Sequence, residues 1–362
     1  PIRIEDIKGA LDLTRGWKVV GGINGGSVKA DEANIADLTA KFDLAGQGDS
    51  LNGALTGVAM RIVDPNPAAT QRFAEASFRG EGFLKDSALT FTGAFNMAKS
   101  GMQIAQVKGS HDLDTGAGGL AFEPIPLIFR PGQFQPEDLS PLLMGPANVT
   151  GRVDIGGAAS WSADGLKASG VLDLRKLGFV LASAGVFEGV SGRIEVADLF
   201  NLKSAPGQRI TIDKVTLGLP IEKGTIDFQL VGFDAIQLEG AEWPFVGGFI
   251  RVDPNRFAFS SSAENRIVAR AVNWDLAVLA DQFKLPDLKL SGVVGGEFPV
   301  LFRTGSAEID NAVLKSVKPG VIQYSGSPGE AAAQADENSK MLFDALKDFR
   351  YEVLEVGLDG NL

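Results

Sequence analysis

The side chain with the most obvious capacity for chemistry is His111, the only histidine among the 362 residues. It lies in the run Ser110-His111-Asp112-Leu113-Asp114, where it could join two carboxylates in a metal site or serve in a Ser-His-Asp triad. Adjacent residues of a strand point to opposite faces, which disfavours the metal site. No Gly-x-Ser-x-Gly nucleophile motif accompanies the histidine. We therefore predict that His111 lies in a solvated turn and that the chain holds no catalytic residue, metal or cofactor.

Other residue types leave one enzymatic alternative open. Asp and Glu number 45, so a glycosidase carboxylate pair is compatible with the composition, but four Trp and two Tyr are few for a sugar-binding cleft. The glycine-rich runs 21–26 and 116–119 lack the Lys-Ser/Thr pair of a phosphate loop and are predicted to be turns. The absence of cysteine excludes thiolate catalysis, disulfides and Cys-ligated zinc, and fits an oxidising compartment.

Net charge and hydropathy limit the classes of partner that the chain could bind. The formal charge of −11 repels phosphate backbones, so we expect no nucleic-acid partner. No apolar run approaches the ~18 residues of a membrane span, and no signal peptide is present. The chain starts at Pro1, and its last strand pattern runs into Leu362 without a closing turn. We expect it to be a soluble piece of a longer protein whose membrane anchor lies outside it.

The elements that must position any site are short strands. Apolar and polar residues alternate repeatedly, as in Ile226, Phe228 and Leu230 against Asp227 and Gln229. This period of two puts one set of side chains on each face of a sheet. The 45 glycines exceed the usual ~7% share and permit turns, bulges and sharp bends. The pattern predicts a mainly β fold, a long, curved, antiparallel sheet.

The spacing of these strand patterns divides the chain into three regions. Residues 1–123 read as a β meander that forms the first part of the sheet, and residues 124–147 are a proline-rich seam or linker with a short helix at 137–144. Residues 148–362 continue the strands. Two helices interrupt them: one at 274–283, and an amphipathic one at 328–349 with a stripe of Met341, Leu342, Ala345, Leu346 and Phe349.

Phenylalanine is the remaining anomaly, with 23 residues against two tyrosines. Phe carries apolar area without a polar group, so it suits a dry core or an apolar cavity wall. A curved sheet with too few helices to cover it leaves one apolar face in need of a partner. Lipid chains are one such partner, and a packed core with a protein partner is the alternative.

Blocks of the C-terminal half resemble a known family. They run from Leu202-Lys203-Ser204-Ala205-Pro206-Gly207 through 218–230 and 238–248 to 290–300, 310–314 and 320–324. In order and spacing they look like the C-terminal region of the YdbH-type proteins, sometimes labelled a dicarboxylate-transport domain and related to the AsmA/TamB group. The likeness covers roughly residues 120–362. The dicarboxylate label is disfavoured, because a small dianion needs convergent cationic groups and the strands show no Arg/Lys cluster.

This resemblance implies a fold and a function. The fold would be a long, twisted, U-shaped β-groove with an apolar concave face. The function would be periplasmic transport of phospholipid between the inner and outer membranes of a Gram-negative envelope, without catalysis. The partners would be phospholipid acyl chains, a small YnbE-like outer-membrane lipoprotein at the C-terminal edge strand, and the inner membrane through an N-terminal anchor absent from this chain.

Two classes of function are thus carried forward: a lipid conduit, and a structural or adhesive β-protein with a packed core and a protein partner. For the conduit, the expected wall residues are apolar side chains at alternate strand positions, although a one-residue slip in register would invert the face of each. They are Leu172, Leu174, Ile194, Val196, Ile210, Ile212, Leu217, Leu219, Ile226, Phe228, Leu230, Phe249, Phe257 and Phe259.

Overall fold

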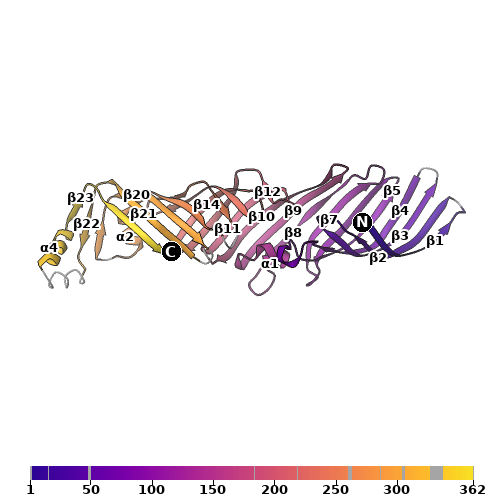
Figure 1. The fold of residues 1–362 in the computed structure, drawn as a ribbon, viewed down its shortest axis with the longest axis horizontal. Helices are drawn as coiled ribbons and strands as arrows, with labels where there is room; N and C mark the ends of the chain where they lie inside the picture. The colour runs from indigo at the N-terminus through magenta and orange to yellow at the C-terminus, as the bar shows by residue number, and fades with distance from the viewer. Residues whose placement is uncertain are drawn as a thin grey trace. The chain divides into compact units, whose positions relative to one another are not determined.

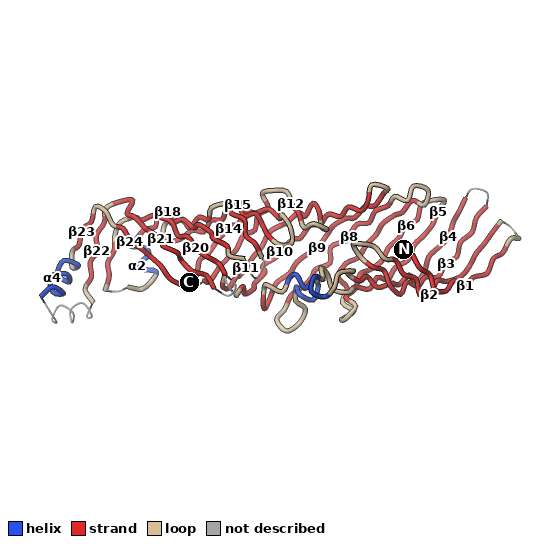
Figure 2. Tube along the Cα trace, viewed as in Figure 1, coloured by secondary structure: helices blue, strands red, loops and turns tan. Residues whose placement is uncertain are grey.

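The computed structural model describes residues 2–14, 16–47, 50–182, 184–217, 219–259, 263–285, 287–303, 306–326 and 337–361. In that part of the chain, 21 strands join in one antiparallel sheet and three short strands in a second, and the few helices are short (Figures 1 and 2). The predicted mainly β antiparallel class is confirmed, while the U-shaped groove stays a prediction. Contacts divide the chain into unit 1 (residues 1–179 and 191–205) and unit 2 (residues 180–190 and 206–362).

Unit 1 is built from consecutive strands, each pairing with the next in chain order (Figure 1). Short turns suffice because the pairs are antiparallel. The strands are β1 (Ile2–Asp12), β2 (Trp17–Val28), β3 (Asn34–Gln47), β4 (Ser50–Val63), β5 (Ala76–Lys85), β6 (Ala88–Met97), β7 (Gln103–Asp112), β8 (Gly118–Phe129), β9 (Ala147–Ser162), most of β10 (Gly165–Leu181), much of β11 (Gly185–Asp198) and β12 (Lys203–Ser204).

Many glycines of this sheet lie beneath aromatic rings, which explains why both residue types are abundant. A Cβ added at Gly93 would overlap the ring of Phe78, and one added at Gly109 would overlap the ring of Phe91. In both cases the register places the ring and the glycine on the same face of the sheet. The missing side chain lets the ring lie close to the neighbouring backbone, so glycine here serves packing as well as bending.

Unit 2 is also a meander of antiparallel strands. β15 pairs with both β16 and β17, and β18 follows β16 and leads to β20. The strands of its large sheet are β13 (Gln208–Leu217), β14 (Leu219–Leu230), β15 (Ala235–Phe245), β16 (Gly248–Val252), β17 (Asn255–Ala258), β18 (Asn265–Asp275), β20 (Val293–Arg303), β21 (Ser306–Lys318) and β24 (Glu355–Asn361).

A helix and a small sheet cover one end of the large sheet in unit 2. Helix α2 (Leu276–Gln282) begins at Asp275, whose carboxylate accepts hydrogen bonds from the next turn, and it confirms the helix expected at 274–283. The small sheet consists of β19 (Leu288–Leu290), β22 (Gly320–Tyr324) and β23 (Phe349–Tyr351). Leu276 and Tyr351 are buried in one cluster with large-sheet residues such as Phe298 and Leu314.

Helix α4 (Glu337–Leu346) lies in the segment where an amphipathic helix was expected, and residues 328–336 of that expectation lie outside the described residues. The predicted packing stripe is wrong at Met341, Ala345 and Phe349, while Leu346 is half-buried. Met341 and Ala345 are exposed, and Phe349 already belongs to β23, whereas Phe343 is buried and meets Tyr324 of β22 edge-on. The described contact between this helix and the small sheet is therefore an aromatic pair between Phe343 and Tyr324.

The proline-rich segment begins inside a strand. Pro124 and Pro126 lie in β8, next to a register shift after Phe122, where a missing backbone donor is tolerated. The helix expected at 137–144 divides into α1 (Pro136–Leu139) and the 3₁₀ turn η2 (Pro141–Leu143). The backbone N–H of Ala74 donates to the carbonyl of Leu139 (2.8 Å), so this segment docks on the loop between β4 and β5.

That loop, which contains the 3₁₀ turn η1 (Ala68–Thr70), is organised by a buried carboxylate, Asp64. Its oxygens accept backbone N–H bonds from Asn66 (3.0 Å) and Phe73 (3.3 Å), and Arg72 pairs with both Asp64 and Glu32. Burial raises the pKa of Asp64, but the backbone N–H donors and the Arg72 guanidinium outweigh it and hold the pKa below its usual range. The ionised form therefore stabilises unit 1.

We expect Asp64→Asn to destabilise unit 1 by about 3 kcal/mol at neutral pH, because it leaves Arg72 short of one charge partner and weakens the backbone bonds. A folded pKa below the unfolded value means that the stabilisation is present above about pH 4 and is lost as pH falls through the folded pKa. Urea unfolding at several pH values should show the two proteins converging in acid. Asp43→Asn, which removes an exposed pair with Lys18, is the control and should change little. A pH-independent difference would contradict this account.

Candidate functional site

The strand register of unit 2 segregates apolar and charged side chains onto opposite faces. Directly opposed residues of paired strands share a face. One row reads Ile210, Ile226, Ala241, Val252, Ala269 and Phe298, and a second reads Trp243, Ile250, Ala271, Gly296, Leu314 and Val356. We call the face that carries these two rows the unit 2 apolar surface. Together the two rows cross eight strands, and neither row contains a charged side chain.

The opposite face carries ion pairs between neighbouring strands. Arg209 pairs with Asp227 (2.6 Å), and Arg251 pairs with Glu242 (2.6 Å). Arg270 pairs with Asp253 and Glu297. The hydrogen bond that Arg209 donates lowers the pKa of Asp227, and the hydrogen bonds that Arg270 donates to Asp253 and Glu297 raise the pKa of Arg270. This charged face is stable in water, so the apolar surface is the face that requires a partner to remove it from water.

Most of the wall residues expected in unit 2 share the apolar surface. Ile210, Ile226, Leu230 and Phe257 are half-buried there, whereas Ile212 and Phe228 are buried. Phe259 contacts Phe257 (ring centroids 6.0 Å apart) and is 54% exposed. Phe249 differs, because the register places it on the charged face, where Arg251 lies over its ring. The side chains of Leu217 and Leu219 lie outside the described residues.

The four expected residues of unit 1 also share a face. Leu172 and Leu174 flank Asp173, and Ile194 flanks Arg193. Asp173 and Arg193 form an ion pair (3.2 Å), so the apolar neighbours on both strands point to the other side. Val196 is buried there, and the other three are half-buried.

His111 is not in a solvated turn, as the sequence predicted. It lies near the end of β7, half-buried, and its Nδ1 accepts a hydrogen bond from Trp161 Nε1 (3.0 Å). The prediction was wrong because the turn begins one residue later, where Asp112 accepts hydrogen bonds from Asp114 and Thr115. Within the described ranges, no group of three or more His, Asp or Glu side chains is arranged to hold a metal.

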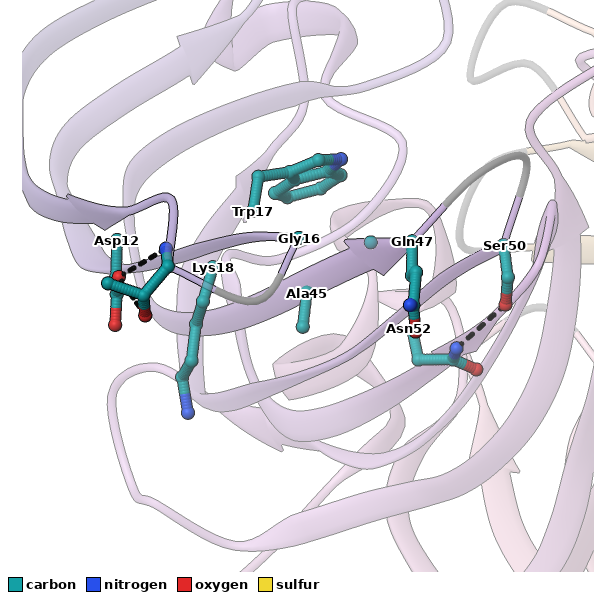
Figure 3. A pocket seen from close by; sticks show the side chains of 10 residues that line it. Asp12, Gly16, Trp17, Lys18, Ala45, Gln47, Ser50 and Asn52 are labelled. Carbon is teal, nitrogen blue, oxygen red and sulfur yellow. Dashed lines mark hydrogen bonds between the residues drawn. The ribbon is translucent and has the colours of Figure 1, made fainter.

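A shallow hollow of about 480 Å³ lies at the strand ends of unit 1 and is lined mainly by polar residues (Figure 3). Its polar groups bond to one another: Thr14 N donates to Asp12, and Asn52 donates to Ser50. The Trp17 ring lies against Gly46. These local bonds explain the hollow as turn structure.

Sequence reasoning missed several residues of the unit 2 apolar surface. Leu238, Phe298 and Leu314 are as buried as Phe228 and share its face. Leu238 lies between Gln237 and Glu239, so its alternation was a signal that was present, whereas Leu314 follows Val313 and shows no alternation. Phe298 lies in Gly-Gly-Glu-Phe-Pro, where glycine and proline obscure the period of two.

A β-sheet with one apolar and one charged face defines a protein that presents a continuous apolar surface. The sequence model described as "YdbH-like: Intermembrane phospholipid transport protein YdbH" matches residues 9–362. The chain therefore belongs to the YdbH-like family of non-catalytic, intermembrane phospholipid transport proteins, and the match extends well before residue 120, where the sequence resemblance began. The intermembrane role implies a periplasmic location. No curated protein and no solved structure matches the chain. Among the described helices, none is long and apolar enough to cross a membrane.

Proposed function

We propose that the chain transports phospholipid by holding acyl chains along the apolar faces of its sheet, with the head groups toward solvent. The observation that supports this most is the register of unit 2, which places two apolar rows on one face and ion pairs on the other. Each methylene removed from water contributes ~0.8 kcal/mol. Many similar apolar positions in series suit movement along the sheet, because no single position binds much more tightly than the next.

Within this proposal, the wall comprises the half-buried residues of the apolar face, which keep area available for a ligand. Ile210, Ile226, Leu230 and Phe257 belong to this group in unit 2, together with the exposed Phe259. Buried residues of the same face, such as Phe228, contribute packing and leave little area for a ligand.

The test is extraction of lipid from the purified chain, followed by mass spectrometry. We expect phospholipids with mixed head groups, because apolar contacts do not distinguish between them. A chain that folds and yields no lipid, before or after incubation with phospholipid vesicles, would overturn the proposal and favour a structural β-protein with a packed core.

We also propose that the strand β24 is the docking edge for a small YnbE-like lipoprotein, and that an N-terminal anchor holds the full-length protein at the inner membrane. Within the described part of unit 2, β24 pairs only with β21, so one of its edges is open to a further strand. Leu354 exchanges hydrogen bonds with Ser316 of the strand β21. Because N–H directions alternate along a strand, the backbone N–H of Val356 points toward β21, and the backbone N–H of Gly357 points toward the open edge.

Gly357→Pro should therefore abolish capture of the lipoprotein and leave the fold intact, because it removes an outward N–H where nothing lies within 4 Å of an added Cβ. Val356→Pro is the contrasting variant, since it removes an N–H directed at β21 and should loosen β24 itself. Pull-down with the lipoprotein and circular dichroism measure the two effects. Undiminished capture by a folded Gly357→Pro protein would show that the partner binds elsewhere.

A further inference from the structure

The position of His111 in the sheet is unusual for a polar side chain. The register aligns Leu84, Leu89, His111, Gly118 and Trp161 across five strands of unit 1, so the histidine shares a face with the two leucines. Leu84 is buried on this face. The row is among the last before the hairpin turns that end β5, β7 and β9. His111 is thus a polar group at the rim of an apolar face.

Its neighbour Trp161 determines which ring nitrogen carries the proton. The indole lies across Gly118, where an added Cβ would come within 2.6 Å of the ring, and Nε1 donates to His111 Nδ1 (3.0 Å). An Nδ1 atom that accepts a hydrogen bond has no proton, so the neutral imidazole carries its proton on Nε2.

The Nε2–H group is free to meet a ligand. Across the described residues no protein acceptor contacts it. His111 Nε2 is also not enclosed. Among the described residues, the enclosed side-chain nitrogen and oxygen atoms without a hydrogen-bond partner are Arg72 Nε and Trp243 Nε1, and His111 Nε2 is not one of them. A single directed donor at the edge of an apolar face is suited to one acceptor oxygen.

The charges at this rim favour an uncharged acceptor. The turns at the same end of the strands carry Asp86, Asp112, Asp114 and Asp164, and Asp112 is engaged in bonds to its own turn. A phosphate placed among these carboxylates would be repelled. In a phospholipid, the uncharged acceptor closest to the acyl chain is the ester carbonyl oxygen.

We propose that His111 Nε2–H donates a hydrogen bond to an acyl-ester carbonyl of a phospholipid whose chain lies on the face formed by Leu84 and Leu89. This inference rests on the proposed function, because it requires acyl chains on the apolar face. The contact fixes how far the lipid sinks into the sheet: the chain lies inside the rim and the phosphate outside it.

A single histidine makes the test direct, since ¹⁵N-labelled imidazole gives the signals of His111 alone. The chain is titrated with dioctanoyl phosphatidylglycerol, with its dioctyl ether analogue, and with inorganic phosphate. We expect the free chain to show the Nε2–H tautomer, and the ester lipid to shift the Nε2–H signal downfield. We expect the ether lipid to bind, as measured by bound phosphorus after gel filtration, without that shift.

Other results overturn the inference in distinguishable ways. An equal shift with the ether lipid assigns the contact to another part of the lipid, and a shift with inorganic phosphate assigns it to a free anion. Lipid binding without any shift removes His111 from the site but leaves the proposed function standing, whereas failure of both lipids to bind rejects the proposed function as well. Trp161→Phe should remove the tautomer preference and reduce the ester-dependent shift; an unchanged shift in this variant would contradict the role given to Trp161.

Discussion

Replacing Phe228 with glutamate should unfold unit 2, whereas the same replacement at Phe259 should leave it folded and impair lipid retention. Phe228 is 6% exposed, and Leu238 lies directly opposite it on the apolar surface. A carboxylate there would be buried without a partner, and we expect a loss of about 4 kcal/mol or more. Phe259 is 54% exposed on the same side of the sheet, so its glutamate would remain hydrated.

The measurements for this pair are urea unfolding and lipid content after purification. The two tryptophans of unit 2, Trp243 and Trp274, report unfolding of that unit in a parent chain whose Trp17 and Trp161 are replaced by Phe, whereas lipid content is measured with both tryptophans in place. We expect Phe259→Glu to lose at least fivefold in bound phospholipid at nearly unchanged stability. A stable Phe228→Glu protein would show that this residue faces open space. Full lipid content in Phe259→Glu would remove that residue from the wall.

The second large effect is expected at Gly224, where valine should cost about 3 kcal/mol. A Cβ added at Gly224 would overlap the indole of Trp243, which lies on the same face of the sheet. Among the described residues the enclosed indole Nε1 has no hydrogen-bond partner, so packing holds the ring over Gly224, and an added side chain would overpack the site.

Gly240 provides the matched control for Gly224. It lies in β15, the strand that also carries Trp243, yet an added Cβ would meet only the carbonyl of Val252, at 3.7 Å. Gly240→Val should therefore be neutral or slightly stabilising, since valine suits a strand better than glycine. Equal urea midpoints for the two variants would show that the ring over Gly224 is not a constraint.

The strand class and many elements followed from sequence because they depend on local patterns. Ile226, Phe228 and Leu230 alternate with Asp227 and Gln229, and the structure places this run in β14. Helix α2 likewise lies within the predicted range 274–283. The failures were long-range in origin. Phe343, which the predicted stripe omitted, is the buried ring of α4, because it packs against Tyr324, 19 residues earlier in the chain.

By itself, the sequence determined that this is an antiparallel β-protein with alternating apolar positions and a likeness to intermembrane lipid transporters, because a period of two and a series of motif blocks are properties of the chain alone. Only the tertiary structure decided which positions share a face. Phe249 and Arg251 lie two residues apart on one strand and share a face, and the pairing of β16 with β18 makes that face the charged one by placing Arg270 beside Arg251. His111 came to lie beside Trp161 through the pairing of β7 with β8 and of β8 with β9. Cross-strand register arises from hydrogen bonds between segments far apart in sequence, and a one-residue slip would have exchanged the two faces.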